Sequence, residues 1–335
     1  MSATRTLDAF QQRHPVVGFP LAVAYKFFDD QGSYLAALIT YYGLLSLFPL
    51  LLLLSTILGI VLHGDPELQR RVVDSALSQF PVIGQDLQEP QRIGGGTTGL
   101  IFGVLGSLYG GLGVAQALQN AMSTAWAIPR NSRPNPFKAR GRSLLLLGTV
   151  GLAVIGTTAL TALSSLASGS LGAAVPALLV AASVLINAGV FTLAFRIATA
   201  RPFALREVAP GAVGAAVAWQ LLQSFGAFYI GRVVQHASAT NGAFALVLGL
   251  IAFIYLAAVA LVLCVEANVV RARRLYPRAL LTPFTDNVDL TRGDRSAYTA
   301  QAKAQRNKGF EDIDVSFGPR PRGDEDEDGH DAPAG

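Results

Sequence analysis

Charged residues are scarce in this sequence. Asp, Glu, Lys and Arg make up 14% of the 335 residues, against roughly a quarter in soluble domains. Between Ser143 and Ala194 there is no charged residue at all. A soluble fold needs charged side chains over its whole surface, so this gap excludes an ordinary soluble domain and predicts a membrane protein.

Cysteine and histidine are also sparse. Cys264 is the only cysteine, which excludes an intramolecular disulfide. The four histidines are scattered along the chain without the spacing of metal ligands. Neither a Walker A lysine motif nor the Gly-x-Ser-x-Gly turn of serine hydrolases occurs. We therefore expect no enzymatic activity, no cofactor and no metal site.

Long apolar stretches are abundant, and six of them are long enough to cross a bilayer as helices of about 20 residues. They predict an all-α integral membrane protein, a bundle of six transmembrane helices at 34–61, 99–128, 143–166, 171–197, 209–230 and 243–265. The expected organisation is a cytoplasmic N-terminal segment (1–33), a six-helix transmembrane domain (34–270) and a cytoplasmic tail (271–335).

The positions of Lys and Arg predict the orientation of these spans. Fifteen of them flank the spans on the side of the two termini, and four lie on the opposite side. Loops rich in Lys and Arg stay in the cytoplasm. Both termini are therefore expected in the cytoplasm of a bacterium, with the chain crossing the plasma (inner) membrane several times.

Two segments outside the spans carry their own signals. The first outer loop, 63–98, has apolar residues at helical spacing from Leu68 to Phe80, which predicts an amphipathic helix on the outer membrane interface. After Pro283 the apolar periodicity ends, and the chain finishes with an acidic run at 323–329. Such a composition predicts a largely disordered tail that could bind cytoplasmic partners.

The first span contains a proline beside polar side chains. Pro49 lacks an N–H group and should kink the helix, next to a cluster of Tyr41, Tyr42 and Ser46. One interpretation is a packing kink in which hydroxyl groups satisfy the backbone. The other is a contact with a substrate or a lipid head group.

Amide side chains recur within three later spans. Two interpretations stay open. The amides could form hydrogen bonds between helices, as amides in lipid usually do, or they could line a hydrated cavity. In the second case they would form one polar groove together with the span 1 cluster. The amides are Gln116, Gln119, Asn120, Asn187, Gln220 and Gln223.

Glu266 is the one carboxylate beside the apolar core of a span, at the cytoplasmic end of 243–265. Ionisable residues at such depth are candidates for function. It could pair with a basic loop residue, such as one from Arg130 to Arg142, or it could take part in proton coupling.

Four stretches together resemble one family of bacterial membrane proteins. They are 41–50 (Tyr-Tyr-Gly-Leu-Leu-Ser-Leu-Phe-Pro-Leu), the segment from Asn120 through Trp126 and Arg130 to Arg142, Ala209-Pro210-Gly211 with Tyr229, and Glu266-Ala267-Asn268. In this combination and order the chain is similar to the YihY/BrkB family over roughly residues 20–280. It departs from the family pattern at Asn241-Gly242 and at Cys264-Val265.

The resemblance implies a six-span inner-membrane protein. Members of this family have been named ribonuclease BN, and others have been linked with serum resistance or with export. A zinc-dependent nuclease would need clustered histidines and aspartates, which this sequence lacks. We therefore expect no nucleic-acid partner. The leading hypothesis is a transporter or flippase-like protein for a lipidic or amphipathic substrate, with membrane lipids as partners, and the alternative is a non-transporting scaffold in the cell envelope.

Overall fold

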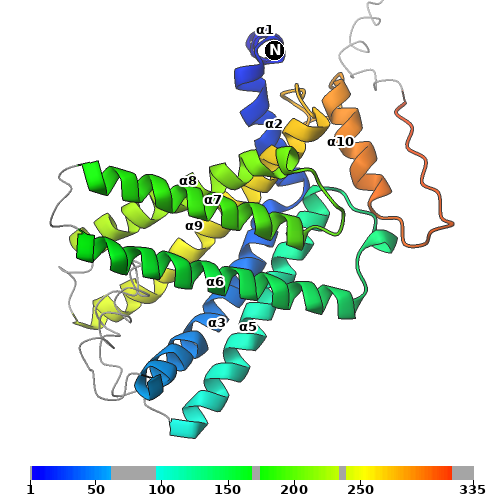
Figure 1. Cartoon of the computed structure of the whole chain (residues 1–335). Coiled ribbons are helices and arrows are strands. Elements are labelled where there is room, and N and C mark those ends of the chain that lie inside the picture. Colours follow the sequence, from blue (N-terminus) through cyan, green and yellow to red (C-terminus); the bar gives the residue numbers. More distant parts are fainter. Residues whose placement is uncertain (1, 62–95, 168–173, 234–238, 319–335) are drawn as a thin grey trace, which may run out of the picture. The chain divides into compact units, whose positions relative to one another are not determined.

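The computed structural model describes residues 2–61, 96–167, 174–233 and 239–318, and in these residues every regular element is a helix. The all-α prediction is confirmed for them (Figure 1). The elements are α1 (Ser2–Arg13), α2 (Pro15–Asp29), α3 (Gly32–Val61), α5 (Gly96–Ala125), the short 3-10 helix η3 (Arg130–Ser132), α6 (Pro136–Ala167), α7 (Ala174–Ala198), α8 (Leu205–Val233), α9 (Ala239–Arg273) and α10 (Arg292–Lys303).

Among the described residues, three helical segments are long and apolar enough to cross a membrane. They are Leu100–Ala125, Ala181–Ala198 and Val247–Arg273, which correspond to the second, fourth and sixth predicted spans. Gly32–Leu47 in the first predicted span is a shorter apolar helix. The number of six spans stays a prediction, and the interfacial helix predicted in 63–98 falls almost entirely outside the described residues.

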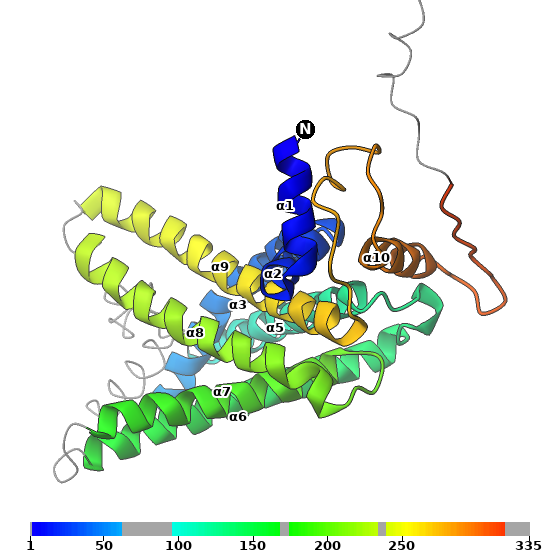
Figure 2. The same cartoon turned by 90° about the horizontal axis from the view of Figure 1, so that it is seen from above.

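The chain divides into two compact units. The larger unit comprises 31–123 and 134–265, and therefore most of the long apolar helices. Within it α7 packs against both α6 and α8, and α6 and α7 run side by side in both views (Figures 1 and 2). Their outward side chains are apolar: Leu152, Leu185 and Leu221 are each more than 60% exposed. Such surfaces suit contact with lipid rather than water.

Glycines on α5 allow α3 to approach closely within the larger unit. A Cβ atom on Gly106 would lie 2.6 Å from Pro49, and one on Gly110 would lie 2.5 Å from Ser46. A Cβ on Gly113 would lie 2.1 Å from the Tyr42 ring. As the residue numbers rise along α5 from 106 to 113, those of the facing residues on α3 fall from 49 to 42, so the two helices are antiparallel. Small residues at helical spacing are a usual means of close packing in membranes.

The smaller unit comprises 1–30, 124–133 and 266–335. Its helix α10 begins at a capping box, in which Thr291 Oγ1 accepts a hydrogen bond from the Asp294 N–H and Asp294 caps the Thr291 N–H in return. Gly293 and Ala297 of this helix are buried. Residues 292–303, within the segment expected to be a largely disordered tail, therefore form a helix with buried residues. The acidic run at 323–329 lies outside the described residues.

The burial of α10 does not depend on apolar area alone. Composition predicts disorder because few apolar residues are available to bury. Here the fully buried Arg278 forms an ion pair with Asp294 of α10, which is fully buried as well.

Candidate functional site

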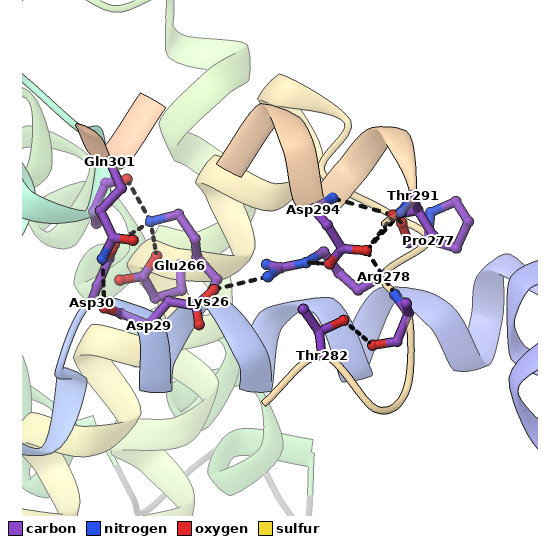
Figure 3. Close-up of polar contacts among 12 residues, drawn as sticks. Lys26, Asp29, Asp30, Glu266, Pro277, Arg278, Thr282, Thr291, Asp294 and Gln301 are labelled. Atoms are coloured by element: carbon purple, nitrogen blue, oxygen red, sulfur yellow. Dashed lines mark hydrogen bonds and ion pairs between the residues drawn. The ribbon is translucent and has the colours of Figure 1, made fainter. Parts of the chain in front are cut away.

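A group of buried charges lies in the smaller unit, where the end of α2 meets α9 (Figure 3). Lys26 and Asp30 are one helical turn apart at the end of α2, and they form an ion pair. The Lys26 Nζ atom also lies 3.4 Å from Glu266 Oε2 of α9. Lys26 is 5% exposed, Asp30 6% and Glu266 0%. We call these three residues the Lys26 cluster.

Lys26 has one more partner. Its Nζ atom donates a hydrogen bond of 3.1 Å to the carbonyl oxygen of Ala125, the last residue of α5. A positive charge at the C-terminal end of a helix is favoured by the helix dipole. Burial alone would lower the Lys26 pKa, but the Glu266 and Asp30 carboxylates outweigh it and raise the pKa above its usual value. Lys26 therefore stays charged at neutral pH.

The two carboxylates of the Lys26 cluster are less well stabilised than Lys26. Burial raises the pKa of Asp30, and the attraction of Lys26 opposes this only in part. The Oε1 atom of Glu266 is buried and accepts no hydrogen bond. An unbalanced buried charge costs several kcal/mol, whereas protonating an ordinary glutamate at pH 7 costs about 3.7 kcal/mol. These magnitudes are comparable, so the cluster can exist with one carboxyl group protonated.

A second group of charges surrounds Arg278. Its guanidinium forms ion pairs with Asp294 of α10 and, at 2.9 Å, with Asp29 of α2. It also lies over the rings of Tyr25 and Tyr298, at 5.9 Å and 5.3 Å from their centroids. We call Arg278, Asp29 and Asp294 the Arg278 cluster.

The Arg278 cluster is held by many backbone hydrogen bonds. Asp294 accepts from the N–H groups of Ala279, at 3.0 Å, and of Thr291, at 2.9 Å. Gln301 of α10 donates to the carbonyl oxygen of Asp29 at 2.7 Å. Through these bonds α2, α10 and the chain after α9 hold one another, as the dashed lines in Figure 3 show. The cluster is built for stability of this unit.

Glu266 pairs with a basic residue, as one of the two interpretations expected, but this residue lies outside the loop that we named as an example. In the described residues its ionic partner is Lys26 on α2, and not a basic residue from Arg130 to Arg142. The Lys26–Asp30 pair could have been predicted from its spacing of four residues. Its meeting with Glu266, 236 or more positions later in the chain, has no signal in a single sequence.

The polar residues predicted in span 1 lie at the contact between α3 and α5. Tyr42 and Ser46 face the glycines of α5, and the Ser46 hydroxyl donates to the Gly43 carbonyl oxygen at 2.9 Å. Tyr41 is 59% exposed. α3 continues through Pro49. This arrangement agrees with the packing interpretation of Tyr42, Ser46 and Pro49.

The predicted amide residues differ in burial and in hydrogen-bond partners. Gln119 is buried and donates to Ala139 O at 3.1 Å and to Ser143 Oγ at 2.8 Å, both on α6. Gln116 is exposed, and Asn187 donates to Ser183 within its own helix at 3.4 Å. The remaining three amides are half-buried: Asn120, Gln220 and Gln223.

An apolar cavity of about 190 Å³ lies within the larger unit. Its wall comes from α3, α5, α7, α8 and α9 and includes Gly43, Phe191, Trp219 and Ala258. None of the nine residues predicted to form a polar groove lines it. The described residues also contain no group of three or more His, Cys, Asp or Glu that could hold a metal ion.

The fold and these sites define a class, a helical membrane protein with apolar helix faces in its larger unit and buried charges in its smaller unit. The particular family follows from comparison with known proteins. The family model described as Virulence factor BrkB matches residues 23–287, and the chain belongs to this family. The resemblance noted in the sequence is thereby confirmed. No curated protein and no solved structure matched the chain.

Proposed function

We propose that this chain is a transporter or flippase-like protein of the bacterial inner membrane, acting on a lipidic or amphipathic molecule. The observation that carries the proposal is the apolar cavity among α3, α5, α7, α8 and α9. A polar or charged solute would lose its hydration there without gaining hydrogen bonds. An acyl chain or another apolar tail would lose nothing, so it is the part of the substrate that fits.

The volume of the cavity limits what enters it. A cavity of about 150 Å³ holds one benzene molecule, and pockets for drug-sized ligands begin at about 300 Å³. At about 190 Å³ this cavity therefore accepts a short stretch of one apolar chain and excludes a whole lipid. The head group and the rest of the chain would remain in the surrounding bilayer.

The membrane location and orientation belong to the same proposal. The distribution of Lys and Arg supports a cytoplasmic position for both termini. The smaller unit contains both terminal segments, so it would lie on the cytoplasmic side.

The test is lipid movement in vesicles of phosphatidylethanolamine and phosphatidylglycerol that contain the full-length protein. A phospholipid with a fluorescent acyl chain is reduced by dithionite from outside, which reports the fraction that has reached the outer leaflet. We expect faster exchange with the protein than without it. Equal rates in both vesicle types would refute the proposal.

A matched pair of variants on α9 links this activity to the cavity. Ala258 lines the cavity, whereas Ala252 is exposed on the same helix. Ala258→Phe should fill the space and bring lipid exchange to the rate of protein-free vesicles. Ala252→Phe should keep the wild-type rate, and equal loss in both variants would separate the activity from the cavity.

The alternative function is a scaffold that binds a cytoplasmic partner. One observation favours it: a polar hollow of about 540 Å³ in the smaller unit, whose lining includes Asp286, Arg295 and Tyr298. Removing 319–335 tests a partner of the acidic run without cutting α10. If this truncation abolished the phenotype of the protein while lipid exchange persisted, the scaffold function would be favoured.

A further inference from the structure

The Lys26 cluster contains one positive group and two acidic groups in a place that water does not reach. The charged groups acting on Glu266 are Lys26 and Asp30, both from the end of α2. The nearby end of α5 contributes the neutral carbonyl of Ala125. If both acids were ionised, the cluster would hold one negative charge without a counter-charge.

The Arg278 cluster also contains one positive and two acidic groups, but its two carboxylates are stabilised in their charged forms. Both Asp294 oxygens accept hydrogen bonds, from Arg278 and from two backbone N–H groups. Its other acid, Asp29, is 21% exposed and reaches solvent. Hydrogen bonds to a carboxylate favour its charged form. Glu266 has neither advantage, because it is fully buried and its Oε1 atom accepts no hydrogen bond.

A metal cation does not fit this place as a counter-charge. Hard cations such as Mg²⁺ and Ca²⁺ need six or more oxygen ligands. In the described part of the chain no three His, Cys, Asp or Glu residues are grouped to hold an ion. A proton needs only one unshared carboxylate oxygen, and Glu266 Oε1 supplies it.

We propose that the Lys26 cluster is a proton-binding site, in which Glu266 carries one proton at neutral pH and releases it at alkaline pH (Figure 3). The proton comes from a hydronium ion of the solvent: one O–H bond of that ion breaks, leaving water, and one O–H bond forms on the carboxyl group of Glu266. Its release leaves Glu266 negative and strengthens the attraction between Glu266 on α9 and Lys26 on α2.

Proton binding at this site would couple the proposed transport to a proton gradient, and the sequence contains no other motif for energy coupling. Helix α9 carries Glu266 and also the cavity residues from Ile254 to Leu261. A change in the attraction between Glu266 and Lys26 therefore acts on the same helix that forms part of the cavity wall. This coupling step rests on the proposed transport function, whereas the proton-binding site itself does not.

Infrared difference spectroscopy tests the site directly. The full-length protein in lipid nanodiscs is titrated from neutral to alkaline pH, and the carbonyl stretch of protonated carboxylic acids is followed. We expect one such band per chain at neutral pH, lost on alkalinisation, although an ordinary glutamate with a pKa of about 4.3 would already be ionised. Absence of the band at neutral pH would overturn the proposal.

Two arms assign the band to Glu266. Protein made with ¹³C-carboxyl glutamate should show the band at a lower frequency, and this arm needs no substitution that could impair folding. Glu266→Gln should lose the band, whereas the control Glu311→Gln should keep it. The Glu311 pKa is lowered by hydrogen bonds from the N–H groups of Asn307 and Lys308. A band unshifted by the label, or retained in Glu266→Gln, would place the proton elsewhere and refute the site.

A separate measurement tests the coupling. Lipid exchange by wild-type vesicles should change between neutral and alkaline pH, and exchange by Glu266→Gln should not change. If the infrared band is present while no lipid moves at any pH, the proton site stands and the transport function fails. If lipid moves with the same pH dependence in both proteins, the coupling fails.

Discussion

The contact between α3 and α5 provides the sharpest stability prediction, for Gly110→Ala. The new Cβ would lie 2.5 Å from Ser46 Cβ and 2.6 Å from Ser46 Cα, whereas ordinary contact begins at 3.4 Å. The helices must therefore separate by about 0.9 Å at this point. Because one of the opposing atoms is backbone, a change of rotamer cannot relieve the overlap.

The magnitude follows from two opposing effects. Overpacking of this kind costs about 1–3 kcal/mol, and replacing glycine by alanine within a helix gains about 1 kcal/mol. The matched control is Gly148→Ala on α6, where no atom lies within 4 Å of the new Cβ and only the gain applies. The free energies of unfolding of the two variants should therefore differ by about 1–3 kcal/mol, and Gly110→Ala should be the less stable one.

Thermal unfolding in one detergent, followed by tryptophan fluorescence, measures this difference. At about 2–4 °C per kcal/mol, Gly110→Ala should melt at least a few degrees below Gly148→Ala. If Gly110→Ala melted at the same temperature as Gly148→Ala, or above it, the close approach of α3 and α5 at Ser46 would be refuted.

Two further predictions concern buried polar groups. Arg278→Met should destabilise the smaller unit by about 3–5 kcal/mol, because it leaves the buried Asp294 carboxylate without its ion-pair partner. Limited proteolysis should then cut within 274–318, whereas the control Arg274→Met, at an exposed position, should leave the digestion pattern unchanged. Equal patterns in both variants would contradict the Arg278 cluster. Gln119→Leu should cost about 1–3 kcal/mol by leaving two acceptors on α6 without their donor, and exposed Gln116→Leu should melt like wild type; the reverse order would contradict the α5–α6 contact.

The sequence allowed the helices of the larger unit to be predicted well. Each apolar run of about 20 residues has its main part in one helix, because a run of this length admits little other structure in a bilayer. Spacing alone could not separate the exposed Gln116 from the buried Gln119. They lie three residues apart on α5, and only the position of α6 distinguishes them.

The buried charges of the smaller unit could be predicted only in part. Lys26 and Asp30 are neighbours on one helix, and their pairing can be inferred from spacing. Glu266 and Arg278 meet α2 from more than 230 residues away, and such pairings depend on the tertiary fold. Composition likewise predicted a largely disordered tail and gave no sign of the ion pairs that Arg278 forms with Asp29 and Asp294.

The central claim is that an apolar chain of a lipid enters the cavity among α3, α5, α7, α8 and α9. Photocrosslinking tests it most directly, using a phospholipid with a diazirine near the end of its acyl chain and mass spectrometry to locate the adducts. We expect adducts on cavity residues such as Trp219 and Leu261, and their loss in Ala258→Phe. Adducts confined to outward side chains such as Leu185 and Leu221, equal in wild type and variant, would contradict the claim.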